Sequence, residues 1–206
     1  MKTSSKTITG ALTVLLTALA VSNVNAAYRA FLKIDGPEVK GESRVAGHED
    51  EIEIFSFSWG ASNPSAQAMH GGGGGAGKVS LSTLTVGKRV DKATPALFRN
   101  AVVGEEHLFD GDEYPIRLVM VYMPEDSEPV EMFSIELNQS QIAELRANVV
   151  PAARGGGDDV PMESLSLSFG KIRMNAAGRD EDGGYRELMP DEAIAVDNPA
   201  FEDDEE

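Results

Sequence analysis

The stretch that decides the fold is Gly47-His-Glu-Asp-Glu-Ile-Glu-Ile-Phe-Ser-Phe-Ser-Trp59-Gly60, which predicts a β-strand running into a long glycine-rich loop. Phe55, Phe57 and Trp59 share one parity of this strand. Ile52 and Ile54 share the other parity, so both faces carry apolar side chains. A strand buried on both faces needs cover on each side, which a sandwich, a barrel or a neighbouring subunit can supply.

The residues that follow, 60–77, are mostly Gly, Ser, Ala and Asn and predict a flexible loop. Gly72 and Gly77-Lys78 have the spacing of a phosphate-binding loop, but Val79 stands where that motif needs Ser or Thr. A strand pattern follows instead of the required helix. Nucleotide binding is therefore disfavoured.

Alternating apolar residues predict six or more strands. They lie at 28–34, 51–59, 78–86, 114–123, 131–137 and from 165 to 174. The apolar parity changes within the third of these, which predicts a bulge near Ser82 or Thr83. It changes again around Gly170, which predicts a bulge or a barrel corner. Many strands and one helix favour an antiparallel barrel or sandwich with a helix on one side.

One helix is clearly indicated, with Thr94 as its cap, Pro95 at its first position and Gly104 at its end. It is short, so it must pack on a sheet to be stable. Residues 138–149 are ambiguous from the pattern alone. Asn138 and Gln141 resemble a helix cap, while a strand is the competing interpretation.

The two ends of the chain differ from its middle. Residues 1–26 predict a secretory signal, with Lys2 and Lys6 before an apolar stretch and Val24-Asn25-Ala26 as the cleavage site. Its apolar stretch is short for a transmembrane helix, so no membrane span is expected after cleavage. Residues 177–206 hold 12 acids and two arginines, which predicts a mobile acidic tail with a short apolar anchor at Ile194 and Val196. The domain proper is then 27–176.

Composition excludes several classes of function. The formal net charge is −16, which disfavours nucleic acid and acidic membrane surfaces as partners. The chain has no cysteine, so an exported form has no disulfides and no thiolate chemistry. Its stability must come from packing or from oligomerisation.

No catalytic, cofactor or metal site is indicated. His48, His70 and His107 lie far apart and lack metal-ligand spacing, so surface or hydrogen-bonding roles are expected. The acidic clusters at 49–53 and 110–113 are expected to be solvated. An enzyme is the least favoured hypothesis: a glycosidase using these carboxylates would lose hydrolysis when Glu51 or Asp112 is replaced.

Four segments in order resemble the hemolysin-coregulated protein (Hcp) family, the tube protein of type VI secretion. They are Tyr28–Gly36, Gly47–Gly60, Lys78–Gly104 with Val90-Asp-Lys-Ala-Thr-Pro-Ala-Leu-Phe98, and Val160–Met174 with Glu163-Ser-Leu-Ser-Leu-Ser-Phe-Gly-Lys-Ile172. The resemblance implies a mainly β fold, a small two-sheet antiparallel β-barrel with one flanking helix. It also implies that the ambiguous residues around Ile142 form a strand.

For function, the resemblance implies a non-enzymatic subunit that forms hexameric rings, which stack into a secretion tube and carry effectors. Partners would be further copies of the chain, effectors, and spike or sheath proteins. The loop after Trp59 would reach a neighbouring subunit or ring. Its candidate contact residues are Trp59, Gly60, Asn63, Pro64, Gly72, Gly74 and Gly77.

Two features depart from the family pattern. Tube proteins assemble in the cytoplasm, whereas a signal sends this chain to the periplasm, the cell surface or the medium. The acidic tail, repeated around a ring, would repel a stacked neighbour unless basic groups receive it. These departures support an alternative, an exported binding or structural module that keeps the fold without the tube function.

Overall fold

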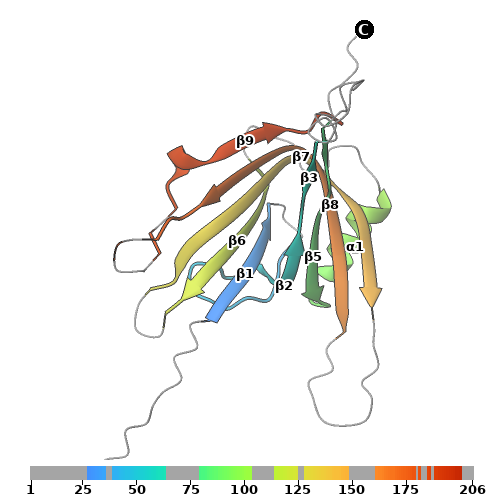
Figure 1. Ribbon diagram of the computed structural model, residues 1–206. Helices are drawn as coiled ribbons and strands as arrows, with labels where there is room; N and C mark the ends of the chain where they lie inside the picture. Colours follow the sequence, from blue (N-terminus) through green and yellow to red (C-terminus); the bar gives the residue numbers. More distant parts are fainter. Residues whose placement is uncertain are drawn as a thin grey trace, which may run out of the picture.

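The protein is a β-barrel in a computed structural model that describes residues 27–35, 39–63, 79–103, 114–124, 128–148, 161–179, 181, 185–186 and 188–200. In chain order the elements are β1 (Ala27–Ile34), β2 (Ile52–Ser58), β3 (Ala61–Ser62), β4 (Ser80–Leu81), β5 (Leu84–Arg89), α1 (Thr94–Val103), β6 (Ile116–Met123), β7 (Val130–Asn148), β8 (Met162–Ala176), a 3-10 turn (Pro190–Glu192) and β9 (Ile194–Asp197). Figure 1 shows their arrangement.

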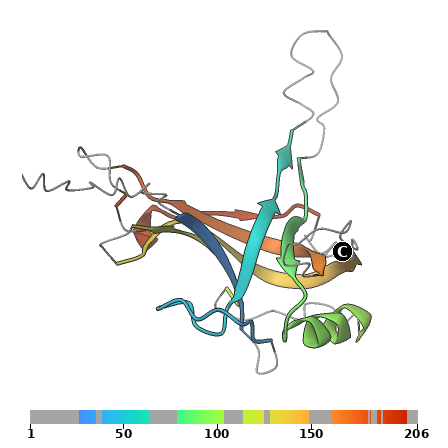
Figure 2. The same ribbon diagram turned by 90° about the horizontal axis from the view of Figure 1, so that it is seen from below.

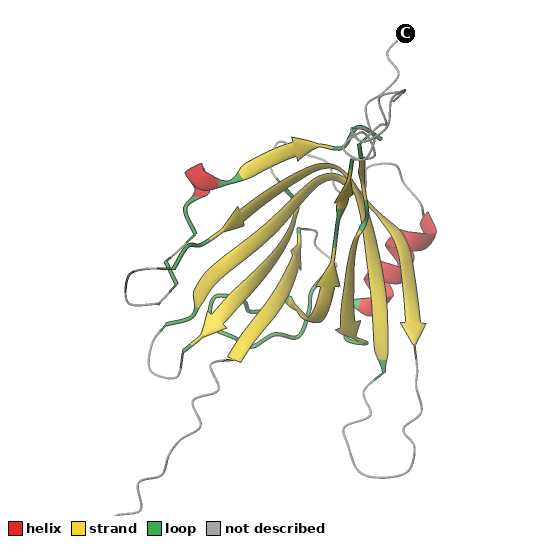
Figure 3. Cartoon of the chain, in the orientation of Figure 1, coloured by secondary structure: helices red, strands yellow, loops and turns green. Residues whose placement is uncertain are grey.

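Six antiparallel strands close the barrel in the order β5-β2-β1-β6-β7-β8, because β8 pairs with β5 as well as with β7. Figure 3 distinguishes the strands from α1 and the 3-10 turn by colour. The expected fold, a mainly β barrel with one flanking helix, is confirmed. Alternate residues of each strand fill the interior. Leu32, Ile116, Leu118, Ile135 and Leu165 are among those with no exposed surface.

The interpretation of β2 as a strand buried on two faces is wrong. A register shift between Ile54 and Ser56 forms a bulge at Phe55. Before the bulge Ile52 and Ile54 face the core, and after it Phe57 packs against the same core. One extra residue therefore turns Phe57 to the same side as Ile52 and Ile54, while Phe55 stays about half exposed beneath the Arg89 guanidinium.

The stretch around Ile142 is a strand, as the resemblance implied, and lies within the 19-residue β7. In both β7 and β8, the residues that face the core change from one parity to the other at the same position along the pair. At that position Gln139 (φ 49°) lies opposite Gly170. A Cβ on Gly170 would lie 2.9 Å from the Gln139 Cβ, so only glycine fits there without a shift. Past this point the free side of β8 pairs with β9 instead of β5. The parity change at Gly170 is thus a barrel corner.

The predicted helix is confirmed as α1, which lies beside β7 and buries Leu97 in the core. Its cap is Asp91 rather than the predicted Thr94. The Asp91 carboxylate accepts the Ala93 N–H at 2.9 Å, and the Thr94 hydroxyl accepts the Asp91 N–H at 3.1 Å. This reciprocal pair is a capping box that begins three residues earlier than expected. The predicted end at Gly104 lies outside the described residues.

Residues 61–62 and 80–81 form the stem of a hairpin. β3 pairs with β4 in a separate two-stranded sheet, which extends away from the barrel beyond β2 and β5 (Figure 2). The bulge expected near Ser82 and Thr83 is a break between β4 and β5, because these two strands belong to different sheets.

The C-terminal extension, residues 177–200, folds back onto the barrel. Its strand β9 pairs with β8 from Lys171 to Met174. Ile194 and Val196, the predicted apolar anchor, lie in this strand, but their side chains are 67% and 42% exposed. Backbone pairing rather than apolar burial therefore holds β9. Residues 201–206 lie outside the described part of the chain.

Candidate interaction surfaces and polar networks

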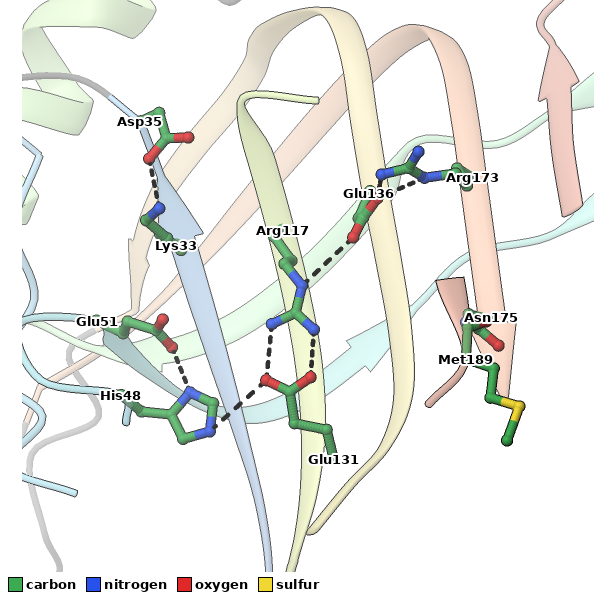
Figure 4. A network of polar contacts seen from close by, with 10 residues as sticks. All are labelled: Lys33, Asp35, His48, Glu51, Arg117, Glu131, Glu136, Arg173, Asn175 and Met189. Atoms are coloured by element: carbon green, nitrogen blue, oxygen red, sulfur yellow. Dashed lines mark hydrogen bonds and ion pairs between the residues drawn. The ribbon is translucent and has the colours of Figure 1, made fainter. Parts of the chain in front are cut away.

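A chain of ion pairs crosses the outer face of the barrel from β6 through β7 to β8 (Figure 4). Arg117 on β6 makes a two-pronged hydrogen bond with Glu131 on β7 and a further one with Glu136 at 3.3 Å. Arg173 on β8 pairs with the other oxygen of Glu136. These residues belong to the outward parity of their strands, so side chains from three adjacent strands meet on one face.

This network also secures residues 39–51 to the barrel. The buried His48 ring stacks on Phe31 of β1, with ring centroids 4.5 Å apart and planes 2° apart. Its Nδ1 lies 2.9 Å from the Glu51 carboxylate and its Nε2 lies 4.0 Å from Glu131. His48 therefore has the hydrogen-bonding role expected from the sequence. Glu51 is largely buried, so its expected solvation is wrong.

Two charged groups in this region have shifted pKa values. Burial alone would lower the pKa of Arg117, but hydrogen bonding and charge attraction with Glu131, and then with Glu136, raise it. Arg117 therefore stays charged. The exposed Asp50 has a lowered pKa because Lys92 hydrogen-bonds to its carboxylate, with a smaller contribution from Lys40.

A second network holds the start of α1 against the barrel. Lys88 points inward from β5 and has no exposed surface. Its amine donates to Glu163 of β8 at 2.5 Å, to Asp91 at 2.8 Å and to the Arg89 carbonyl at 2.8 Å. The Thr94 hydroxyl donates to the same Glu163 oxygen at 2.7 Å. One buried ion pair thus joins two strands to the cap of the helix.

The Lys88–Glu163 pair was not predicted from the sequence. A signal was present, because Lys88 continues the inward parity of Leu84 and Val86, and Glu163 continues that of Leu165. Two charges of opposite sign at inward positions indicate a buried pair once the two strands are known to be neighbours. That neighbour relation joins strands 75 positions apart, and the local pattern does not contain it.

The predicted contact loop is described only at its base. Trp59 is 40% exposed and stacks on Phe133 of β7 with ring centroids 5.4 Å apart. Gly60 and Asn63 lie at the hairpin stem, where the Gly60 carbonyl accepts the Ser82 N–H at 2.8 Å. The four other candidates lie outside the described residues, namely Pro64, Gly72, Gly74 and Gly77.

Three further residues considered from the sequence, His70, His107 and Asp112, lie outside the described residues. Among the residues that the structure does describe, no group of three His, Asp or Glu side chains is placed to hold a metal ion. Within those same residues, no helix has the length and apolar character needed to cross a membrane.

The C-terminal extension lies over the outer face beside the ion-pair network. The buried Asn175 amide donates to the Met189 carbonyl at 2.6 Å. Leu188, Pro190 and Ala193 of the extension line a pocket with Arg117 and Arg173. Further back, Tyr185 packs on Tyr28 at the start of β1 and on Tyr122 of β6. The extension therefore touches the barrel at several separate points.

The described polar groups hold a helix, a loop and the C-terminal extension against a closed six-stranded barrel, so the protein belongs to the class of small antiparallel β-barrels. Residues 31–175 match the family model described as "Type VI secretion system effector, Hcp". Protein hcp1 of Pseudomonas aeruginosa is 32% identical over 153 residues, which cover 74% of this chain and 85% of that protein. The chain therefore belongs to the Hcp family.

Solved structures agree with this assignment. The crystal structure of Hcp1 from Salmonella typhimurium has 26% identity and a TM-score of 0.56, and the match covers 84% of this chain and 97% of that one. A structure described as a type six secretion system protein has a TM-score of 0.65, with 83% and 96% of the two chains covered. At 23% identity, the latter supports the fold alone.

Family membership makes the chain a structural protein of type VI secretion, from a family of tube proteins rather than of enzymes. Proteins of this family are secreted by that system. The match ends at residue 175, one residue before the end of β8, so β9 and the rest of the extension lie beyond the family-matched region.

Proposed function

We propose that the mature chain is a ring-forming tube subunit, with six copies in a ring, rings that stack, and effectors carried inside. The observation that carries this proposal is the family match over residues 31–175, which spans nearly the whole barrel. No nucleic acid, cofactor or metal is part of the proposed function.

The hairpin that continues from β2 and β5 is the proposed contact with a neighbouring subunit or ring. Its stem extends away from the barrel (Figure 2), and Trp59 at its base is fixed by stacking on Phe133. A rigid base with an extended stem suits an arm that meets another copy. The contact residues would then be those of the loop from Trp59 to Gly77.

Native mass spectrometry over a range of protein concentrations tests the ring directly. The expected result is a six-subunit species, and a strict monomer at the highest concentration would refute the proposal. A variant in which a short Gly-Ser turn replaces residues 64–78 tests the arm. It should keep the barrel, as judged by circular dichroism, and lose stacking between rings or the ring itself.

We also propose that residues 1–26 are a cleaved export signal and that the mature chain begins at Ala27. Supporting this, β1 starts at Ala27 and the family match starts at residue 31, so the barrel is built from residues after the cleavage point. N-terminal sequencing of the protein from periplasm and medium checks it. A fully retained residue 1–26 segment would contradict it.

The signal pattern and the extension favour a second candidate, an exported surface or periplasmic module with the same fold and no tube role. The two candidates differ in how the protein leaves the cell. Deleting the genes for type VI components should leave export of the module unchanged. Export that stops in such a strain excludes the module and favours the tube subunit.

A further inference from the structure

The family-matched part of the chain leaves one strand edge open. β5 covers the free side of β8 only from Met162 to Leu167, up to the corner at Gly170. Beyond the corner, no described residue of the family-matched region pairs with the edge from Lys171 to Met174. An open edge presents unpaired N–H and C=O groups and is a template for another strand.

The extension closes this edge mainly by backbone pairing and by the polar contacts of Asn198. β9 pairs in register from Met174 opposite Ile194 to Lys171 opposite Asp197, and all four of its side chains are exposed. Asn198, which is 6% exposed, secures the end next to the corner. Its N–H donates to the Gly170 carbonyl at 2.6 Å and its side-chain amide to the Phe169 carbonyl at 2.7 Å.

Such a contact is specific in register and low in stabilisation energy. Backbone pairing and the Asn198 bonds define where β9 sits, while apolar burial, the main stabilising force in the barrel, contributes little to β9. Every copy of the chain carries the same edge and the same strand. The contact can therefore form between two copies with the geometry it has within one.

We propose that the edge of β8 from Gly170 to Met174 is a strand-acceptor site for the β9 segment of a second copy of this chain, and that the chain's own β9 occupies the site in the isolated molecule. The segment from Ala176 to Ile194 spans about 60 Å when extended. A domain of this size has a radius of gyration of about 15 Å, so the segment is long enough to reach a touching neighbour.

The hydrogen-bond pattern supplies a matched pair of test variants. Asn198 directs its N–H toward β8, and alternation along an antiparallel ladder makes Val196 and Ile194 do the same. Ala195 directs its N–H away from β8. Val196→Pro therefore removes a ladder bond, whereas Ala195→Pro is tolerated at the outer side of an edge strand.

The acceptor test uses a peptide of residues 188–200 with an activated disulfide at the position of Asp197. The chain has no cysteine, so Lys171→Cys provides the only thiol, opposite that position. The adduct should form at least tenfold faster with Val196→Pro than with Ala195→Pro, in which the chain's own β9 competes. Equal rates in the two variants, or no adduct in either, would overturn the proposal. A chain ending at Ala177 provides a second open-edge variant if Val196→Pro fails to fold.

Pairing of β9 from one copy with β8 of another copy is tested with the double variant Lys171→Cys and Asp197→Cys in the full mature chain. Oxidation at low protein concentration should give a link within one chain. As the concentration rises, the share of links between chains should increase, as seen on non-reducing gels. Links within one chain only, at every concentration, would refute exchange between copies. Ring formation is measured independently, by native mass spectrometry of the unmodified chain, so failure of strand exchange and failure of the ring can be distinguished.

Discussion

Replacing Lys88 by Met tests how much the buried network stabilises the fold. Met has a similar length and no charge, so the change leaves Glu163 and Asp91 without the amine that neutralises them. The Glu163 side chain has no exposed surface, and its second oxygen has no protein partner. Breaking a buried pair by removing one partner costs about 3–5 kcal/mol, because an uncompensated charge stays buried.

That loss is large against a total stability of about 5–15 kcal/mol for a domain. It corresponds to a fall in melting temperature of about 10 °C for a chain of this length. Urea unfolding followed by circular dichroism measures the change. The matched control is Arg146→Met, which breaks an exposed pair with Glu144 and should cost about 0–1 kcal/mol.

The double variant Lys88→Met and Glu163→Met removes both buried charges at once. Because two apolar side chains then replace the pair, it should recover at least half of the stability lost in Lys88→Met. A Lys88→Met variant that loses no more than Arg146→Met would refute the reasoning. So would a double variant less stable than Lys88→Met.

Three smaller predictions concern the outer face. Gly41→Ala should lower the free energy of unfolding by about 1–3 kcal/mol, because the added Cβ would collide with the Glu51 backbone carbonyl. Gly60→Ala is the control, since its Cβ would make only an ordinary contact, and urea unfolding compares the two variants. Arg117→Leu should cost about 1–2 kcal/mol in the same assay, because the partly buried carboxylates beside it lose their charged donor, and an unchanged stability would contradict this. Lys92→Met should raise the lowered pKa of Asp50 toward its usual value, and NMR titration of Asp50 measures this. In the unmodified chain, the Asp50–Lys92 contact stabilises the fold at pH values above the unfolded-state pKa of Asp50. This stabilisation is lost as the pH falls through the lower folded-state pKa.

The sequence predicted most of the barrel because its information there is local. Alternation along residues 28–34 and 114–123 reappears in β1 and β6 within a residue or two. The capping pattern near Thr94 placed α1 correctly, although Asp91 is the residue that caps it. Gly170 indicated the corner because a glycine inside an alternating strand is typical of a bulge or a tight bend.

The parts that local pattern missed depend on pairing between distant segments. The bulge at Phe55 is a register shift between β2 and β5. Without knowledge of that shift, the apolar residues on both parities of β2 indicated a strand buried on two faces. The position of β9 against β8 likewise follows from an edge that opens only when the barrel closes. Composition of the acidic tail could not indicate a strand whose side chains are all exposed.

The barrel and the extension are held by different forces, and this difference has a consequence for function. The barrel strands β1, β2 and β5 to β8 bury an apolar core and contain a buried ion pair, so their opening requires a free energy close to that of unfolding the whole domain. The extension is attached by backbone pairing, by Asn175 and Asn198, and by packing of the partly exposed Tyr185 on Tyr28 and Tyr122, so its local opening requires less free energy. We therefore expect the extension to detach more readily than any barrel strand. Because β9 closes the edge of β8 from Lys171 to Met174, its release would expose that edge to another copy while the barrel keeps its own pairing.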